Sequence, residues 1–463
     1  MVYQRLLGDD FLTVDECSIR KDVVRLSLPS VVEQALFMVV GVVSTIFAGR
    51  VGKEAVSAIG LVNVVINFII VLFVALSTGC MVLVARLIGE ENPDKAKEAV
   101  RQSVVIGAAL SVIITIFCYI FSNAIIKLFF GRAENDVVIL ASECFKIMLY
   151  TFPLALINII ISGSMRGAGD ARTPMIIANI VNIINIILGY TLIFGIKASF
   201  ISLNGMGALG AAWSSALSRG IGGVLSIAAL VAIRTPISIN IFSKFSIDLG
   251  ILKRMLNIGI PAALEQAIMQ GGFLVLQMVI SSMGTVAIAV YQIGMSISSI
   301  CFVPIWGFGM AATTLTGQNL GARKYDIAEK CGWTTLKISV ACISLLSVII
   351  FIFSGQLVSV YNSDPEVIRI GASAIRIFCL SQPFVAVVVV ISGSLRGAGD
   401  ILYVMVTSFI GIWGFRILMT VLLNILFGMG IMGVWIALFF DFFSRSLLYM
   451  LRYRKGRWKS IVV

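Results

Sequence analysis

Two ten-residue segments of this chain are almost identical, although they lie half a chain length apart, at an offset of 391 − 161 = 230 in the numbering. The first, Ile161–Asp170, is ISGSMRGAGD, and the second, Ile391–Asp400, is ISGSLRGAGD, so nine of the ten positions match. A segment that recurs at half the chain length predicts two equivalent structural halves, with functional sites at the interface between them.

A second pair of segments extends the duplication toward the start of each half. Leu28–Ala35 (LPSVVEQA) matches Ile260–Ala267 (IPAALEQA) at an offset of 260 − 28 = 232. Pro153 also matches Pro383, at an offset of 383 − 153 = 230. Because the offset stays nearly constant, we infer that the whole unit was duplicated.

The composition is that of a membrane protein. Hydrophobic residues make up 59% of the chain, charged residues only 13%, and the mean hydropathy is +1.03, which is too apolar for a soluble domain. Apolar stretches of roughly 20 or more residues can each cross a hydrocarbon core as a helix, whereas the alternating segments typical of a membrane barrel are absent. The predicted spans are 26–49, 56–85, 102–126, 137–163, 173–196, 207–233, 255–282, 287–316, 334–354, 367–392, 402–427 and 431–452.

Basic residues predict the orientation of these spans. They are concentrated after the second, fourth, sixth and eighth spans and in the tail, which is typical of cytoplasmic segments, so both termini are expected to be cytoplasmic. Six spans per half is an even number, so the two repeats are expected to be parallel. The predicted fold is an all-α polytopic membrane protein with twelve transmembrane helices in two pseudo-symmetric six-helix lobes. Its predicted parts are a cytoplasmic N-terminal segment (1–25), an N-lobe (26–233), an inter-lobe cytoplasmic linker (234–254), a C-lobe (255–452) and a basic cytoplasmic tail (453–463).

Several classes of chemistry are excluded by composition. The N-terminal segment 1–25 contains no long apolar core, so we expect no signal peptide. The eight cysteines follow no metal-like spacing, and with no histidine in the chain any proton transfer must use carboxylates. We therefore expect no cofactor other than a coupling ion. The net charge of +12 is spread over short loops, which argues against nucleic acid as a partner.

Three carboxylates lie inside apolar spans: Glu33, Glu265 and Asp441. A charge at the centre of a membrane helix costs about 2.5–3.5 kcal/mol on insertion scales, so such acids usually face a cavity or a partner. Glu33 and Glu265 occupy matching repeat positions, each one turn after a proline that can bend the helix. Each of these two is interpreted either as an ion-coupling site or as a structural anchor bonded to a neighbouring helix.

The third acid, Asp441, has several candidate partners. It precedes Arg445 by one turn, in the order that favours an ion pair within a helix, and we predict that pair as its structural role. Ion coupling is the alternative role for Asp441. Arg416 and Arg219 are further basic residues inside spans that could pair with acids on other helices.

Polar and soft side chains near these acids predict a substrate-binding lining. Three asparagines, Asn179, Asn182 and Asn185, share one helical face because they are three residues apart. Any one of these side chains can simply hold helices together, but as a set they could hold a large cation adaptably. The predicted substrate-binding residues are Gln34, Gln266, Gln270, Tyr291, Gln292, Asn182, Asn185, Trp306 and Met310.

The duplicated RGAGD loops resemble phosphate cradles only superficially. They lack the Lys-Ser/Thr ending of a P-loop and follow predicted helices rather than strands. We instead expect the glycines to form a tight cytoplasmic turn, with Arg166 and Arg396 holding carbonyl groups or lipid phosphates. No other nucleotide-binding motif is present, so an ion gradient is the expected energy source.

The doubled RGAGD segment, IPAALEQA, the Tyr291-Gln292 pair and the ending GVWIALFFDFFSRSLLYMLRYRKGRW resemble the multidrug and toxic compound extrusion (MATE) family over essentially the full length. The resemblance implies two six-helix lobes around a central cavity and antiport of amphipathic, often cationic compounds against sodium ions or protons. Acids that many members carry in the first, fifth and tenth spans are missing here, near Ser44, Gly189 and Val385. The family's acid in the seventh span usually lies about one turn after Glu265, so that match is approximate.

These observations predict a secondary active antiporter of the cell (inner) membrane rather than an enzyme. Because the family's other acids are missing, ion coupling is assigned to Glu265 and Glu33, with Glu265 as the sodium ligand if sodium is the coupling ion. The expected partners are small amphipathic or cationic substrates and membrane lipids, and a monomer is favoured. One alternative is a flippase for lipid-linked precursors, which needs basic residues in its cavity, with Arg219 and Arg416 as the candidates. A membrane-embedded transferase is a remote alternative, because it needs a catalytic histidine or paired acids.

Overall fold

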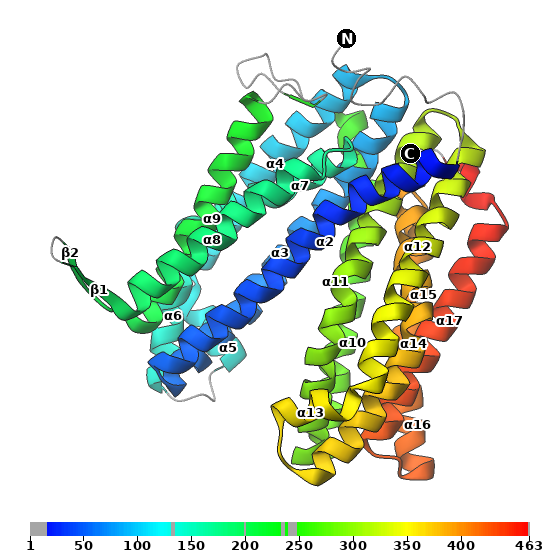
Figure 1. Ribbon diagram of the computed structural model, residues 1–463. Coiled ribbons are helices and arrows are strands. Elements are labelled where there is room, and N and C mark those ends of the chain that lie inside the picture. Colours follow the sequence, from blue (N-terminus) through cyan, green and yellow to red (C-terminus); the bar gives the residue numbers. More distant parts are fainter. Residues whose placement is uncertain (1–15, 131–134, 199–200, 233–236, 239–247, 462–463) are drawn as a thin grey trace. The chain divides into compact units, whose positions relative to one another are not determined.

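The computed structural model describes residues 16–130, 135–198, 201–232, 237–238 and 248–461, and nearly all of them are helical (Figure 1). In this part of the chain, eleven helices are long and apolar enough to cross a membrane, and a bent pair of shorter helices raises the number to as many as twelve. The twelve predicted spans are therefore confirmed by length and composition. Most of the predicted linker at 234–254 lies outside the described residues.

The chain divides into two compact units, each described by itself below. The N-unit contains Val32–Val84 and Asn92–Gly259, and the C-unit contains Met1–Val31, Ala85–Glu91 and Ile260–Val463. This division differs from the predicted lobes at the first helix of each half. Helix α2 (Glu16–Val51) begins in the C-unit and continues in the N-unit, and α10 (Leu249–Ser281) does the reverse; the division falls within three residues of the repeated proline in each helix. Helix α3 (Lys53–Gly89) lies mostly in the N-unit.

The other elements of the N-unit are α4 (Pro93–Ile120), α5 (Ser122–Phe130), α6 (Asn135–Leu149), α7 (Phe152–Gly167), α8 (Arg172–Phe194), β1 (Gly195–Ala198), β2 (Ile201–Asn204) and α9 (Gly207–Ala232). Helix α9 packs against α6, α7 and α8. Large buried side chains such as Phe73, Phe145 and Leu156 form the apolar core beside it. The antiparallel β1–β2 hairpin was not predicted from the sequence.

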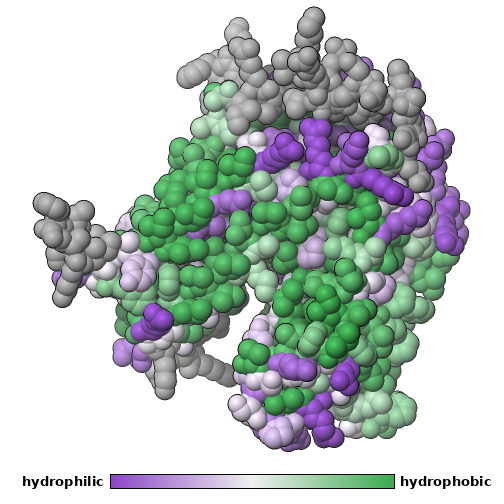
Figure 2. Space-filling view, viewed as in Figure 1, coloured by the Kyte–Doolittle hydropathy of each residue, from purple (hydrophilic) through white to green (hydrophobic). Residues whose placement is uncertain are grey.

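The C-unit continues with α11 (Thr285–Gly321), α12 (Tyr325–Ile352), α13 (Ser354–Tyr361), α14 (Pro365–Gly397), α15 (Ile401–Phe409), the π-helix η1 (Ile410–Ile417), α16 (Leu418–Phe427), α17 (Ile431–Arg454) and the short helix η2 (Arg457–Ser460). Helix α14 is central to this unit, because it packs against α11, α12 and α17. On the visible face of the C-unit, hydrophobic side chains cover the middle and hydrophilic ones gather at the ends (Figure 2). That distribution suits a bundle surrounded by lipid.

The two RGAGD loops have the same backbone structure. Gly169 and Gly399 adopt φ angles of 90° and 88°, which favour glycine. The amide of Asp170 donates to the carbonyl of Met165 at 2.9 Å, and the amide of Asp400 donates to that of Leu395 at 2.8 Å. These bonds are typical of a glycine-terminated helix end, so the predicted tight turn is confirmed. These bonds also occupy backbone N–H groups of the loop that would be needed to bind a phosphate group.

The first glycine of each RGAGD segment serves a different purpose, the close approach of two helices. A Cβ atom on Gly167 would lie 2.4 Å from the carbonyl oxygen of Met81 in α3, and one on Gly397 would lie 2.2 Å from that of Thr313 in α11. Met81 and Thr313 are themselves related by the repeat (313 − 81 = 232). Small residues at such positions let membrane helices pack closely, so the duplicated motif encodes a helix contact as well as a turn.

The two halves differ at their matching prolines. The fourth span is broken into α6 and α7, which are bent by 56° just before Pro153, whereas α14 runs unbroken through Pro383. At the break, the Thr151 hydroxyl donates to the carbonyl of Ala216 in α9 at 2.6 Å. The matching residue, Ser381 (151 + 230 = 381), instead donates to a carbonyl of its own helix. A bond to a neighbouring helix therefore accompanies the break in one half only.

Candidate functional site

In the N-unit, Glu33 of α2 forms an ion pair with Arg166 at the end of α7. One guanidinium nitrogen, Nη2, donates to Oε1 at 2.6 Å and to Oε2 at 2.8 Å. Both side chains are only 15% exposed. Arg166 thus binds a carboxylate of the first repeated helix, which is a charge-assisted partner. Its binding of carbonyl groups or lipid phosphates stays a prediction.

In the C-unit, Glu265 of α10 forms the corresponding ion pair with Arg396 at the end of α14. Nη2 of Arg396 donates to Oε1 at 2.6 Å, and Nε donates to Oε2 at 3.2 Å. Among the described residues Arg396 thus binds a carboxylate rather than carbonyl groups, and its binding of lipid phosphates stays a prediction. The anchor interpretation of both glutamates gains a named partner, and their role in ion coupling stays a prediction.

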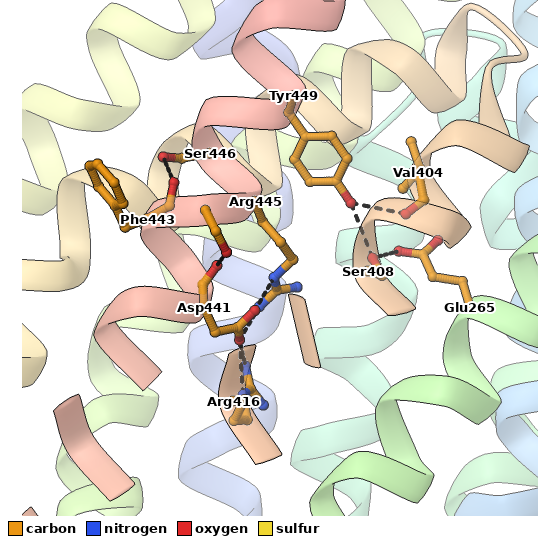
Figure 3. A network of polar contacts seen from close by, with 10 residues as sticks. Glu265, Val404, Ser408, Arg416, Asp441, Phe443, Arg445, Ser446 and Tyr449 are labelled. Carbon is orange, nitrogen blue, oxygen red and sulfur yellow. Dashed lines mark hydrogen bonds and ion pairs between the residues drawn. The ribbon is translucent and has the colours of Figure 1, made fainter. Parts of the chain in front are cut away.

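Glu265 differs from Glu33 because a chain of neutral oxygen atoms begins beside its carboxylate (Figure 3). The Ser408 hydroxyl of α15 donates to Oε1 of Glu265 at 3.2 Å and lies 3.1 Å from the Tyr449 hydroxyl of α17. Tyr449 in turn donates to the carbonyl of Val404 at 3.0 Å. Three helices thus supply carboxylate, hydroxyl and carbonyl oxygens in one buried chain, and oxygen atoms are the ligands that hard cations prefer.

A second buried cluster joins Asp441 to two arginines (Figure 3). Arg416 of the π-helix η1 donates to Oδ2 of Asp441 from Nε at 2.9 Å, and Arg445 donates to the same oxygen from Nη2 at 2.8 Å. Asp441 is fully buried. The predicted Asp441–Arg445 pair is confirmed, and Arg416 pairs across helices as the sequence suggested. One carboxylate between two guanidinium groups leaves the cluster with an excess positive charge.

The surroundings of this cluster fit it closely. A Cβ atom on Gly411, in η1, would lie 2.5 Å from Oδ1 of Asp441 and 2.5 Å from Cδ of Arg445. The guanidinium groups of Arg416 and Arg445 lie 5.4 Å and 5.1 Å from the ring centroid of Phe442, a cation–π geometry. Segments of π-helix are rare and frequently occur at functional sites.

The N-unit has a neutral version of the same arrangement. Matching Gly207 to Gly430 gives an offset of 223 (430 − 207 = 223), which places Ser218 at the position of Asp441 (218 + 223 = 441). Ser218 accepts a hydrogen bond of 3.4 Å from the amide of Asn185 in α8. In the N-unit, α8 and α9 thus contact each other through neutral groups. In the C-unit, η1 and α17 contact each other through charged groups.

The predicted lining residues are distributed over both units. Asn182 and Asn185 of α8 and Gln34 of α2 are partly buried in the N-unit. In the C-unit, Gln270, Gln292 and Trp306 are exposed, Gln266 and Met310 are partly buried, and Tyr291 is buried, with its ring centroid 6.2 Å from that of Trp435. Substrate binding by these residues stays a prediction. Within the described ranges, no group of three or more acidic or cysteine side chains could hold a metal ion.

Ser408 and Tyr449 are not among the predicted site residues, because they carry no signal beyond their place in apolar spans. The partners of Arg166 and Arg396 were not predicted either, although the sequence carries a signal for them. The two arginines are repeated at an offset of 396 − 166 = 230 and the two glutamates at an offset of 265 − 33 = 232. Oppositely charged residues repeated at nearly the same interval are candidates for a repeated ion pair.

Comparisons with known proteins agree with this architecture. The MatE family model matches residues 29–191 and 261–422, one match in each half. The chain is 31% identical over 458 residues to the probable multidrug resistance protein NorM of Thermotoga maritima, covering 96% of this chain and 94% of the relative.

Solved structures show the same fold. A MOP superfamily transporter from Pyrococcus furiosus, whose reverse polarity of binding pocket is described as suggesting a different function, matches with a TM-score of 0.87 and 25% identity over 98% of this chain and 97% of its own. An outward-facing multidrug resistance MATE family transporter matches with a TM-score of 0.85 and 25% identity over 95% of both chains. The repeated family match, the membrane-spanning helices and the full-length relatives show that this chain is a multi-pass membrane protein of the MatE family of multidrug efflux transporters.

Proposed function

We propose that the protein is a secondary active antiporter that exports amphipathic, often cationic compounds in exchange for sodium ions or protons by alternating access. The similarity to a probable multidrug resistance protein of Thermotoga maritima supports multidrug export. The absence of a nucleotide-binding motif from the sequence supports an ion gradient as the energy source. We further propose that it acts as a monomer in the cell (inner) membrane, with both termini cytoplasmic.

The observation that carries this proposal is the position of Glu265 between Arg396 and the Ser408 hydroxyl. Arg396 neutralises the carboxylate in this arrangement. A sodium ion or proton that binds Glu265 has to displace the guanidinium group, while Ser408, Tyr449 and the Val404 carbonyl remain as neutral oxygen neighbours. Exchange of the Arg396 guanidinium for a cation at Glu265 links ion binding to a rearrangement between the middle of α10 and the end of α14.

The other two carboxylates have different roles in this proposal. Glu33 is bound by Arg166 and is the equivalent anchor of the N-unit. Asp441 is shared by two arginines, so a coupling cation would meet an excess of positive charge there. Glu265 therefore carries ion coupling, and Asp441 holds η1 against α17.

A flippase for lipid-linked precursors is the second candidate, and the excess positive charge of the Asp441 cluster favours it. A pyrophosphate-bearing substrate needs uncompensated cationic groups. Arg416 is already bound to Asp441, however, which reduces the charge it can offer. The antiporter proposal also requires an arginine to leave a buried carboxylate, but Glu265 is held by one arginine and Asp441 by two.

Transport in proteoliposomes tests the antiporter against the flippase. Ethidium uptake is measured with an outward sodium gradient, an outward proton gradient, or neither. We expect one gradient to drive accumulation, and Glu265→Gln to reduce that accumulation at least about tenfold, because an amide cannot exchange a full charge. Glu329→Gln, which removes a carboxylate from the Lys459 ion pair at the start of α12, is the matched control and should leave it unchanged. Gradient-driven accumulation that persists in Glu265→Gln would show that this coupling site is wrong.

A further inference from the structure

Arg219 lies at the middle of an apolar membrane helix. It is twelve positions from the first residue of α9 and thirteen from the last (219 − 207 = 12; 232 − 219 = 13). At about 1.5 Å per residue, roughly 18–20 Å of helix separates it from either end. Arginines that snorkel to the headgroups lie near helix ends, so a lipid headgroup cannot easily reach this guanidinium.

Its side chain is on the inner face of α9. Leu217, Val224 and Val231 are exposed and recur every seven residues, which makes them one stripe of the helix. Arg219 is two residues after Leu217, which is a rotation of about 200° around the helix axis at roughly 100° per residue. Arg219 is therefore on the side of α9 opposite the exposed stripe. The residue two turns further along the Arg219 stripe is Ser226, which is buried and hydrogen-bonded to Asn158 of α7.

Arg219 differs from four other helical arginines that are buried or partly buried. Arg166, Arg396, Arg416 and Arg445 are each bound to a carboxylate. Within the part of the chain that the structure describes, Arg219 has no hydrogen bond, ion pair or ring contact, although it is mostly withdrawn from the surface. A permanently charged group in this position is costly and marks a functional site.

A second hydrogen-bond donor lies close to this position. Oδ1 of Asn158 accepts hydrogen bonds from Ser162 and Ser226, which leaves the amide nitrogen Nδ2 as a donor. Nδ2 lies 3.6 Å from the point that a Cβ atom on Gly222 would occupy, and Gly222 is one helical turn after Arg219. The same point lies 2.7 Å from Cγ2 of Val181 in α8, so a valine methyl fills the space beside Gly222. Asn158 and Arg219 thus lie toward the same side of α9 and have only hydrogen-bond donors to offer.

We infer that Arg219, together with the Asn158 amide, binds the anionic group of an amphipathic substrate: a carboxylate, sulfonate or phosphate. The inference rests on the transport function proposed above and extends its substrate class to acids and zwitterions. The N-unit would hold the negative end of the compound, and Glu265 of the C-unit would carry the coupling cation. A guanidinium group with a neutral amide donor is a strong receptor for such anions in a dry site.

Binding of two dyes to the full-length protein in phosphatidylcholine nanodiscs tests the inference. Rhodamine 110 carries a free carboxylate, and rhodamine 123 is its methyl ester. Fluorescence anisotropy gives Kd for each dye without any ion gradient, so a failure of the antiport proposal leaves the measurement interpretable. We expect Arg219→Gln to raise the Kd of rhodamine 110 about tenfold and the Kd of rhodamine 123 less than about twofold. Arg376→Gln, which removes an arginine bound to Ser354 in the C-unit, should leave both Kd values unchanged.

Other results would overturn the inference. An unchanged Kd for rhodamine 110 in folded Arg219→Gln, or an equal loss for both dyes, would exclude an anion site. If Arg219→Gln does not fold, Arg219→Lys provides the same comparison. Lysine lacks the planar guanidinium group, so we expect a higher Kd for rhodamine 110 but not for rhodamine 123. Equal changes in the two Kd values would again exclude the site. Phosphatidylglycerol added to the nanodiscs identifies the other source of anion. If it displaces rhodamine 110 in an Arg219-dependent way, the site belongs to lipid phosphate rather than to a substrate.

Discussion

Arg396 binds Glu265 through two separate nitrogen atoms, and Arg166 binds Glu33 in the equivalent place of the other half. Each pair joins the two repeated segments of one half: the arginine comes from the RGAGD segment and the glutamate from the proline-containing helix. The duplication therefore preserved an interaction as well as a sequence. Its two copies differ in their neighbours, because a serine and a tyrosine hydroxyl lie beside Glu265.

Arg396→Gln should destabilise the protein more than Arg166→Gln. Removal of one partner from a buried ion pair costs about 3–5 kcal/mol, because it leaves an uncompensated charge. Glu265 is 5% exposed at its side chain and Glu33 is 15% exposed, so we expect the larger loss at Arg396. Thermal unfolding in detergent measures both. The double variant Glu265→Gln/Arg396→Gln should recover part of the loss, and a purely additive result would contradict a direct interaction.

Asp441→Asn should be among the most destabilising single changes in the C-unit. It leaves Arg416 and Arg445 buried together without a carboxylate, at a cost of about 3–5 kcal/mol. The double variant Asp441→Asn/Arg445→Gln removes one of the unpaired charges and should be more stable than Asp441→Asn alone. Equal stability of the two variants, measured by chemical unfolding, would show that Arg445 does not contribute to the cluster.

Gly411→Ala and Gly414→Ala form a matched pair within η1. A Cβ atom at Gly411 would overlap Asp441 and Arg445, whereas one at Gly414 meets no atom within 4 Å. Overpacking costs about 1–3 kcal/mol. We therefore expect a lower unfolding temperature for Gly411→Ala and little change for Gly414→Ala. Similar effects for both would mean that the cluster tolerates a shift of the π-helix.

Gly167→Ala and Gly397→Ala test whether the repeated glycines perform the same function in both halves. Each new Cβ atom would meet a backbone carbonyl, of Met81 or Thr313, at 2.4 Å or 2.2 Å. We expect both variants to lose stability by about 1–3 kcal/mol. Gly355→Ala, where no atom lies within 4 Å, is the control. A loss confined to one of the two repeats would show that the helix contacts are not equivalent, whatever their sequence identity.

The local turn chemistry could be predicted because it depends on neighbouring residues. The RGAGD turn follows from the positive φ of Gly169 and Gly399, and the Asp441–Arg445 pair follows from helical spacing. The third member of that cluster does not follow from helical spacing. Arg416 and Arg219 both stood in apolar spans, and only the packing of η1 against α17 decided that Arg416 pairs with Asp441.

By itself the sequence determined the membrane class, the number of spans, the twofold repeat and the loop turns, because hydropathy and glycine conformation act over a few residues. Only the tertiary structure decided the partners of Glu33 and Glu265, the break before Pro153 but not at Pro383, and the place of Ser408 and Tyr449 beside Glu265. The physical reason is that these features depend on atoms brought together from helices far apart in the sequence. Charge and periodicity along one helix do not specify which neighbour it faces.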